Sequence, residues 1–356
     1  MTNSFPSWST VRLGALLLGV AACGKKESDP QKPRVYTTVS TLAGSGVEGF
    51  ADGAGSAARF AAPEGAAVDG QGNVYVADPG NARIRKITPA GMVSTLAGTG
   101  TAGTLNGALT TARFVGPVDV AIDSQNNLYV ADGNCIRRIA GNTVSTYAGA
   151  EASGYAEGSA TAARFSSVNG VTVDARGVLY VSDYSNYRIR KIMPDGTVST
   201  LAGTGQRGYA DGAGSTAQFA GPEGLAVDAQ GTVYVADFAG YRIRKITPEG
   251  TVSTLAGTGQ RGSNDGAGST AQFAGPTGIT LDAQGNLYVA DIGNHCIRKV
   301  TPAGDVSTLA GTRVSGATDG PVGTAQFDLP AGMTSAGDGT LYVTEFGQRI
   351  RAIKAE

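Results

Sequence analysis

Short apolar runs alternate with turn residues along almost the whole chain. In residues 198–255, for example, the runs 225–227, 233–236, 241–246 and 252–255 are separated by tight turns rich in Gly, Pro and Asp. Runs of this length bounded by turn residues predict β-strands, so this unit contains four strands. The second run, Val-Tyr-Val-Ala, is apolar on both sides of its pleat, which indicates a strand that is covered on both faces.

The segment Val-Ser-Thr-Leu-Ala-Gly sets the period of this pattern. It begins at Val39, Val93, Val198, Val252 and Val306, and the variant Val-Ser-Thr-Tyr-Ala-Gly begins at Val144. Successive starts are 54, 51, 54, 54 and 54 residues apart, which indicates tandem duplication. Six such units predict an all-β fold, a six-bladed β-propeller of four-stranded blades. A solenoid is the alternative, but the polar caps that it would need are not visible in the sequence.

The two partial units predict how the ring closes. The last unit supplies three strands, near residues 332–335, 341–344 and 350–353, and no further Val-Ser-Thr-Leu-Ala-Gly follows them. Val39–Leu42 is the strand that this blade lacks. Pairing it beside the C-terminal strand closes the ring and removes two exposed edges. The propeller is therefore expected to cover residues 39–356.

The N-terminal residues are expected to direct and anchor the protein. Arg12 precedes an apolar run at 13–22, which is too short to span a bilayer, so residues 1–22 are interpreted as a signal peptide. Val20-Ala21-Ala22-Cys23 resembles the lipobox of bacterial lipoproteins, which implies a diacylglycerol on Cys23. Residues 23–38 then form the lipidated cysteine and a flexible tether. We expect a lipid-anchored, extracytoplasmic protein of a bacterial cell envelope, with the outer membrane favoured because Gly24 is not the Asp that often retains lipoproteins at the inner membrane.

Charge and residue counts narrow the function. The net charge is −1, so no broad positive field exists to hold nucleic acid. Zinc catalysis of the amidating-lyase type needs several histidines, and a Ser-His-Asp triad needs one, but His295 is the only histidine in the chain. Cys135 and Cys296 lie three units apart, on opposite sides of a six-membered ring, so they are predicted to be unpaired thiols.

The repeated pieces resemble the NHL repeat family. These pieces are Val-Asp-x-x-Gly-x-x-Tyr-Val-Ala-Asp followed by Asn-x-Arg-Ile-Arg-Lys-Ile, and variants of them recur in all six units. The resemblance implies a propeller used mostly as a binding platform. Similar propellers also include lyases and the lactonase relatives of gluconolactonase, some of which carry a metal ion in the central channel, so the fold does not settle the function.

Residues that recur in every unit are predicted to be scaffold. An acidic residue ends the second strand of each unit, where it can accept backbone amides and pair with the following arginine. One Phe in each link between units is predicted to be a hydrophobic plug. The acidic residues are Asp78, Asp132, Asp183, Asp237, Asp291 and Glu345, and the plugs are Phe60, Phe114, Phe165, Phe219, Phe273 and Phe327.

A functional site is expected where the units differ. One face, formed by the links and by the turns between second and third strands, has variable side chains that are mostly aromatic. A set of this kind suits a protein or envelope-polymer partner, although the alternative that these rings pack on neighbouring blades stays open. The members of this aromatic arc are Phe50, Tyr155, Tyr184, Tyr187, Tyr209, Phe238, Tyr241, His295 and Phe346.

A second variable set precedes the innermost strands, at the mouth of the predicted channel. Glu64, Asp119, Asn169 and Glu223 belong to it, and Glu64 and Glu223 are expected to face each other across the axis. Such oxygen ligands suit Ca²⁺ or Mg²⁺. Two hypotheses follow. The first is a monomeric, membrane-anchored binding or scaffold propeller without cofactor or catalysis, and the alternative is a metal-dependent lactonase or lyase that uses these four residues.

Overall fold

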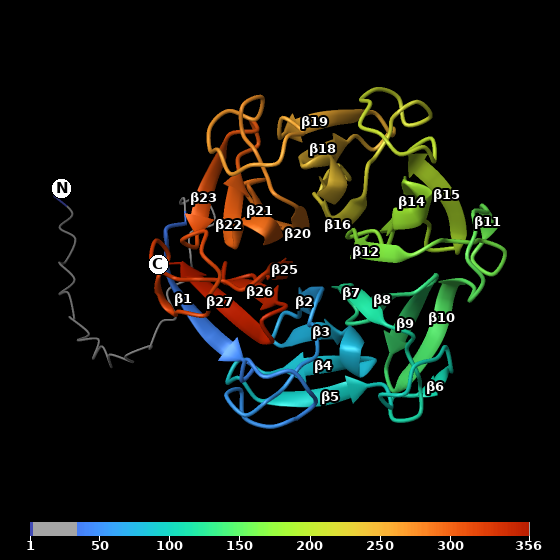
Figure 1. Cartoon of the computed structure of the whole chain (residues 1–356), viewed down its shortest axis with the longest axis horizontal. Helices are drawn as coiled ribbons and strands as arrows, with labels where there is room; N and C mark the ends of the chain where they lie inside the picture. The colour runs from blue at the N-terminus through green and yellow to red at the C-terminus, as the bar shows by residue number, and fades with distance from the viewer. Residues whose placement is uncertain (3–33, 356) are drawn as a thin grey trace. The chain divides into compact units, whose positions relative to one another are not determined.

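The computed structural model describes residues 1–2 and 34–355, and residues 34–355 form a six-bladed β-propeller (Figure 1). The predicted signal peptide, Cys23 and most of the tether lie outside the described residues. Each blade is an antiparallel sheet. In blades one to five the four main strands follow the chain from the axis outwards, and in the sixth the outer strand comes from the N-terminal end of the array. The predicted fold class is therefore confirmed. In the described part of the chain, no helix is long and apolar enough to cross a membrane.

The strand bounds follow the repeat. The innermost strands are β2 (Ala66–Val68), β7 (Pro117–Ile122), β12 (Val168–Val173), β16 (Pro222–Val227), β20 (Pro276–Leu281) and β25 (Pro330–Ser335). The second strands are β3 (Val74–Asp78), β8 (Leu128–Asp132), β13 (Leu179–Asp183), β17 (Val233–Asp237), β21 (Leu287–Asp291) and β26 (Leu341–Glu345). The third strands are β4 (Arg83–Ile87), β9 (Cys135–Ala140), β14 (Arg188–Ile192), β18 (Arg242–Ile246), β22 (Cys296–Val300) and β27 (Arg349–Ala355). The outer strands are β5 (Val93–Ala97), β10 (Thr143–Gly149), β15 (Thr197–Ala202), β19 (Val252–Ala256), β23 (Val306–Ala310) and, in the sixth blade, β1 (Tyr36–Ala43).

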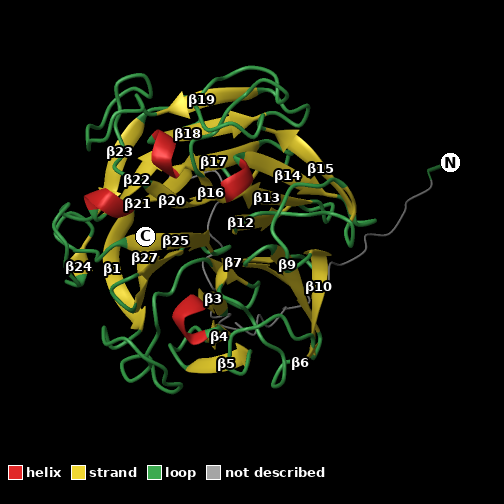
Figure 2. Ribbon diagram, turned by 45° about the vertical axis from the view of Figure 1, so that its right-hand side comes forward, coloured by secondary structure: helices red, strands yellow, loops and turns green. Residues whose placement is uncertain are grey.

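Smaller elements lie in the connections. Short 3-10 helices follow the second strand of blades one, three, four and five, and appear red in Figure 2: η1 (Pro79–Asn81), η2 (Tyr184–Asn186), η3 (Phe238–Gly240) and η4 (Ile292–Asn294). In blades two, three and six the link pairs with the outer strand through β6 (Gly107–Ala108), β11 (Gly158–Ser159) and β24 (Gly320–Pro321). In the other three blades a single bridge, such as Gly53 to Val93, takes the same place. Each link thus covers the outer edge of its own blade.

The closing strand pairs as predicted, although it begins earlier. Strand β1 runs antiparallel to β27, with Val39 opposite Ile353 and Thr41 opposite Arg351. It starts at Tyr36 and not at Val39, so the boundary predicted between tether and propeller moves three residues towards the N-terminus. The reason is that the Tyr36 ring is buried and packs edge to face on Tyr288, with 5.4 Å between ring centroids. The pairing of the two ends of the array is confirmed.

The hydrophobic cores lie between adjacent blades. All five residues of each second strand are buried, as the two-sided apolar pattern predicts. One core, for example, joins Tyr288 and Ile297 of the fifth blade to Val343 and Ile353 of the sixth. The six link phenylalanines are fully buried plugs, which confirms their predicted role.

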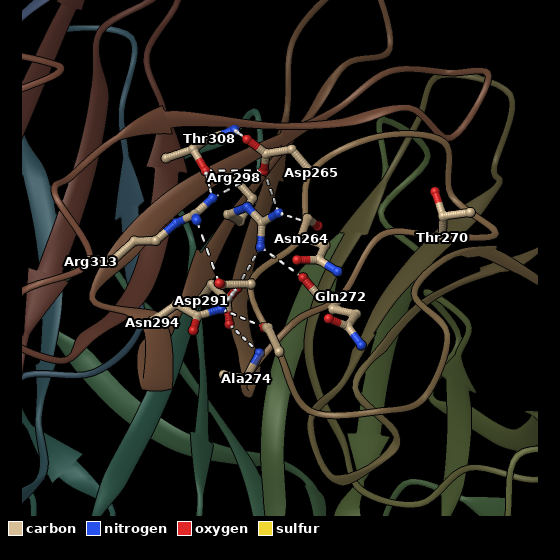
Figure 3. Close-up of polar contacts among 12 residues, drawn as sticks. Asn264, Asp265, Thr270, Gln272, Ala274, Asp291, Asn294, Arg298, Thr308 and Arg313 are labelled. Carbon is tan, nitrogen blue, oxygen red and sulfur yellow. Dashed lines mark hydrogen bonds and ion pairs between the residues drawn. The ribbon is translucent and has the colours of Figure 1, made fainter.

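A buried ion network repeats in the blades and fixes the links to the sheets. In the fifth blade, Arg298 lies between two carboxylates, 2.9 Å from Asp291 and 2.6 Å from Asp265 (Figure 3). Asp291 also accepts the backbone amide of Ala274 at 2.8 Å, and Asp265 accepts that of Thr308 at 3.1 Å. The strand-end acids are therefore scaffold, as predicted.

Candidate functional site

A cavity of about 410 Å³ follows the propeller axis and is lined by all six innermost strands. Its walls carry apolar side chains such as Val120, Val171 and Leu225, together with hydroxyl side chains such as Thr172 and Thr334. Polar side chains gather where the innermost strands begin, on the face of the links and of the turns between second and third strands. This end of the cavity is called the channel mouth below, and its polar residues are Glu64, Asp119, Asn169, Glu223 and Thr277.

Close packing of the innermost strands positions the mouth residues. A glycine follows the variable residue in five of the blades. A β-carbon at Gly332 would lie 2.3 Å from the carbonyl oxygen of Glu64 in the next blade, and one at Gly170 would lie 2.2 Å from that of Glu223. Only glycine permits this approach between backbones. The preceding side chains are thereby brought together around the axis, with blades one and four, which hold Glu64 and Glu223, on opposite sides (Figure 1).

Asp119 replaces that glycine in the second blade and acquires a structural role. Its Oδ1 accepts the backbone amide of Val120 at 2.8 Å, and its Oδ2 accepts that of Val171, in the third blade, at 2.9 Å. The carboxylate therefore ties two innermost strands together while it lines the cavity. The carboxylates of Glu64 and Glu223, in contrast, accept no hydrogen bond from any residue in 34–355, which leaves them available to a ligand.

The three acids of the mouth share one electrostatic environment. Burial raises the pKa of Glu64 to about 7, and the charge of Asp119 adds to the shift. Burial likewise raises the pKa of Glu223 to about 8, with further contributions from Glu64 and Asp237. Burial raises the pKa of Asp119 to about 7, although its two backbone amides oppose the shift. All three side chains keep some contact with the space of the channel, so solvent there screens part of this repulsion.

These shifts predict that the stability of the protein falls as the pH rises. Between about pH 4.5 and 8 the folded protein holds protons on these acids that the unfolded chain has already released. The stabilisation that these protonated acids give the folded state is therefore complete below pH 4.5 and is lost as the pH rises through 7 to 8. Replacing Glu64 and Glu223 together by Gln should reduce the loss between pH 5 and 8.5 by on the order of 1–3 kcal/mol. Urea unfolding at both pH values measures this. The exposed Glu249→Gln serves as the control, and equal pH slopes in the wild type and the double variant would contradict the shifts.

The structure divides the predicted aromatic arc into three groups. Phe238 and Phe346 line the channel mouth, together with Ile292 at the same position of its repeat. Tyr184 lies beside them: its ring packs at Gly221, and its pKa is raised by burial and further by the charge of Glu223. Part of the arc and the acidic set, which the sequence suggested as two sites, therefore line one cavity.

The second group belongs to the links and stacks on arginine. The Phe50 ring lies 3.9 Å from the guanidinium of Arg83, and the Tyr155 ring lies 4.0 Å from that of Arg188. Tyr209 covers Arg242 in the same way, at 4.7 Å. These rings stay 46–64% exposed, but they are partly engaged in intramolecular cation–π contacts.

The third group, Tyr187, Tyr241 and His295, lies at the residue that follows a 3-10 helix. All three have left-handed backbones, with φ of 50–52°, and none of them lines the cavity. Tyr241 was predicted to begin a strand, which is wrong, because the left-handed residue ends η3 and β18 begins at Arg242. His295 Nδ1 accepts the backbone amide of Leu329 at 3.2 Å, so the imidazole connects blades five and six.

The remaining candidate chemistry is limited. Cys135 and Cys296 are buried free thiols, as predicted. Among residues 34–355, no three His, Cys, Asp or Glu side chains come close enough together to hold one metal ion. The Ca²⁺ hypothesis for Glu64, Asp119, Asn169 and Glu223 is not favoured by the geometry of Asp119, whose oxygens both already accept amides.

Comparison with known proteins identifies the repeat. The family model described as NHL repeat matches residues 60–87, 219–246 and 273–300. Human NHL repeat-containing protein 2 is 30% identical over 315 residues, which cover 76% of this chain and 43% of that protein. The chain spans less than half the length of the first curated relatives that it matches.

Solved structures share the architecture at low sequence identity. An auxiliary nutrient binding protein from Bacteroides thetaiotaomicron superimposes with a TM-score of 0.68 at 16% identity, covering 91% of this chain and 77% of that one. Virginiamycin B lyase from Staphylococcus aureus gives a TM-score of 0.54 at 14% identity, covering 89% and 99%. At these identities the likeness concerns the fold alone. With its matched repeats and its six blades, the chain belongs to the NHL-repeat β-propellers.

Proposed function

We propose that this protein is an extracytoplasmic, lipid-anchored binding propeller that holds a cationic group of its partner at the channel mouth and catalyses no reaction. The observation that supports it most is the meeting of Glu64 and Glu223 with Phe238 and Phe346 in one cavity on the axis. Unpartnered carboxylates in a partly desolvated pocket attract a positive charge, and aromatic rings at the rim add cation–π attraction.

The partner is proposed to be a protein or an envelope polymer. The exposed rings of Phe50, Tyr155 and Tyr209 belong to links that lie on the same face as the mouth, so a large partner can contact them while one of its groups enters the cavity. The fold neighbour named as an auxiliary nutrient binding protein is in keeping with capture of a ligand outside the cytoplasm.

The lyase and lactonase alternative retains one argument, namely that fold neighbours include virginiamycin B lyase and a putative gluconolactonase. We favour binding because Asp119 and His295 are both committed to backbone contacts. Lone carboxylates without a positioned proton acceptor or nucleophile beside them suit binding better than catalysis.

Anchoring is proposed to occur through Cys23, after removal of residues 1–22. In a bacterial host, metabolic labelling with an acyl chain should modify the wild-type protein and not Cys23→Ala, because the lipid is attached to the thiol. Fractionation should then find the variant in the soluble fraction. A Cys23→Ala protein that partitions fully with membranes would contradict lipid anchoring.

The binding site is tested with small cationic probes. Acetyl-Gly-Lys-Gly-amide and a glucosamine dimer represent the protein and polymer partners, and calorimetry at pH 8 measures their affinity. Replacing Glu64 and Glu223 by Gln, or Phe238 and Phe346 by Ala, should weaken binding about tenfold or more, since each pair removes charge or cation–π contacts. Phe50→Ala is the matched control, because it removes an aromatic ring of the same face outside the cavity. Unchanged affinity in both double variants would contradict a site at the mouth.

A further inference from the structure

In four blades the third strand begins with an arginine whose guanidinium group is held by backbone carbonyl oxygens. Arg83 donates to the carbonyl oxygens of Asn81 at 3.0 Å and Thr99 at 2.8 Å. Arg188 and Arg242 make the equivalent pairs of contacts, and Arg349 makes one of them. The place on the variable face where these guanidinium groups lie is called the arginine seat below.

A glycine in the following link leaves the room that each arginine needs. A β-carbon at Gly100 would lie 2.1 Å from the guanidinium of Arg83, and one at Gly205 would lie 2.1 Å from that of Arg188. Gly46 and Gly259 stand in the same relation to Arg349 and Arg242, at 2.0 and 2.2 Å. Arginine and glycine thus form a matched pair in four of the six blades.

The two remaining blades have changed both partners at once. Cys296 replaces the arginine in the fifth blade, and Arg313 replaces the glycine. The Arg313 guanidinium lies 2.9 Å from Thr308 Oγ1, 3.5 Å from Asp265 and 3.5 Å from Ser263 Oγ, and Ser263 holds the repeat position of Phe50. The guanidinium of Arg313, which comes from the link and not from the third strand, therefore lies near the place that the arginine seat has in other blades.

In the second blade the seat is empty and acidic. Cys135 replaces the arginine, Glu151 replaces the glycine and Thr104 replaces the stacking ring, and these residues line a pocket of about 220 Å³ with Val115 and Asn134. The pocket contains no Lys or Arg. It is large enough for a guanidinium with water around it, because one water molecule takes up about 30 Å³ in the liquid.

Hydrogen bonds within the pocket fix the position of the Glu151 carboxylate. Asn134 Nδ2 donates to the backbone carbonyl of Glu151 at 2.8 Å, and Thr104 Oγ1 donates to the Glu151 carboxylate. Both contacts hold the carboxylate at the pocket wall. Burial raises the pKa of the Cys135 thiol to about 11, so the thiol is neutral. Asp132 also lines the pocket but is paired with Arg137 at 3.0 Å, so Glu151 provides the charge that a ligand meets.

We propose that this second-blade pocket binds the guanidinium group of an arginine side chain from a partner polypeptide. The arginine seats of four other blades show which group fits this place, and here the chain supplies a carboxylate in place of a guanidinium. A guanidinium from outside would pair with Glu151 and cover Val115, which is 48% exposed. The pocket shares no lining residue with the axial cavity and is independent of the function proposed above.

The pocket is tested by titrating the isotope-labelled protein with acetyl-Gly-Arg-Gly-amide. The backbone amide signals of Gly103, Gly133 and Glu151 should shift and saturate, and the citrulline counterpart, which is neutral, should leave them unchanged. Glu151→Gln should weaken binding about tenfold or more. If the arginine peptide moves no signal of the pocket, or the citrulline peptide moves the same signals equally, the proposal is overturned. Tighter binding of free arginine than of the blocked peptide would contradict a polypeptide source.

Two further variants use the repeat as an internal control. Cys135→Arg combined with Glu151→Gly restores the pair of the four other blades, so it should fill the pocket and abolish binding. Arg313→Glu gives the fifth blade the Cys–Glu pair of the second, so it should create a second site near Cys296. Wild-type affinity in the filled variant would overturn the proposal, and so would the absence of a second site in a folded Arg313→Glu protein.

Discussion

Deleting residues 36–43 is expected to destroy the cooperative unfolding of the propeller or to lower its melting temperature by more than about 10 °C. The deletion removes β1, which buries Tyr36, Val39 and Ala43 and pairs along β27. Each buried side chain of this kind contributes roughly 1.5–3 kcal/mol, except the smaller alanine, and the backbone pairs add about 1 kcal/mol each. The loss also exposes the edge of β27 to aggregation.

Deletion of residues 24–33 is the matched control for ring closure. These residues precede Arg34, which hydrogen-bonds to the Gly337 carbonyl at 3.3 Å, and the sequence predicts them to be a tether. Their removal should leave the melting temperature almost unchanged. Calorimetry of the two deletion proteins compares them directly, and equal melting temperatures would contradict closure by β1.

Replacing Arg298 by Met is expected to cost about 3–5 kcal/mol. Arg298 is fully buried between Asp291 and Asp265, and Asp291 is buried as well. The variant keeps a similar side-chain length but leaves the Asp291 carboxylate without its positive partner. Urea unfolding at pH 7 measures the loss.

The control for this network is Arg176→Met, which breaks a pair whose arginine is exposed. Arg176 lies 2.7 Å from Asp174, but its side chain is 66% exposed. Its removal should cost much less than that of Arg298, because water already screens the exposed guanidinium. Similar costs for the two variants would show that the buried network does not fix the links to the blades.

The scaffold could be predicted from the sequence because the repeat multiplies each signal by six. In every unit an acid ends the second strand and an arginine follows it. A pair that recurs in all six units is more simply explained as structural than as catalytic, and Arg298 with Asp291 shows this. The closing strand could be predicted because the last unit lacks its fourth strand, while an extra copy of that strand precedes the first unit. Its start at Tyr36 was missed because Tyr36 lies outside the repeated segment and is held by a ring contact with Tyr288.

The site was only partly predictable, because side-chain direction decides it. Phe238 and Tyr241 lie three residues apart, yet Phe238 reaches the channel and Tyr241 takes the left-handed position that ends η3. The sequence placed both in one arc. The shared electrostatic environment of Glu64 and Glu223 also depends on how closely the innermost strands approach, which spacing does not reveal.

The second-blade pocket was missed although the sequence contains a signal for it. Cys135 and Cys296 stand where the other units have an arginine, but the simultaneous change of the link glycine to Glu151 or Arg313 becomes meaningful only when the two positions are known to touch. Comparison of equivalent contacts between units finds such pairs, because a repeat protein contains its own controls.

The most direct test of the central claim follows the carboxyl carbons of Glu64 and Glu223 by NMR while the pH is raised, with and without acetyl-Gly-Lys-Gly-amide or the glucosamine dimer. Without probe, the two groups should titrate near pH 7 and 8. With a bound cation their pKa values should fall, because the positive charge stabilises the ionised carboxylates. Titration curves that neither probe moves, at concentrations that saturate any binding seen by calorimetry, would contradict a cation-binding channel mouth.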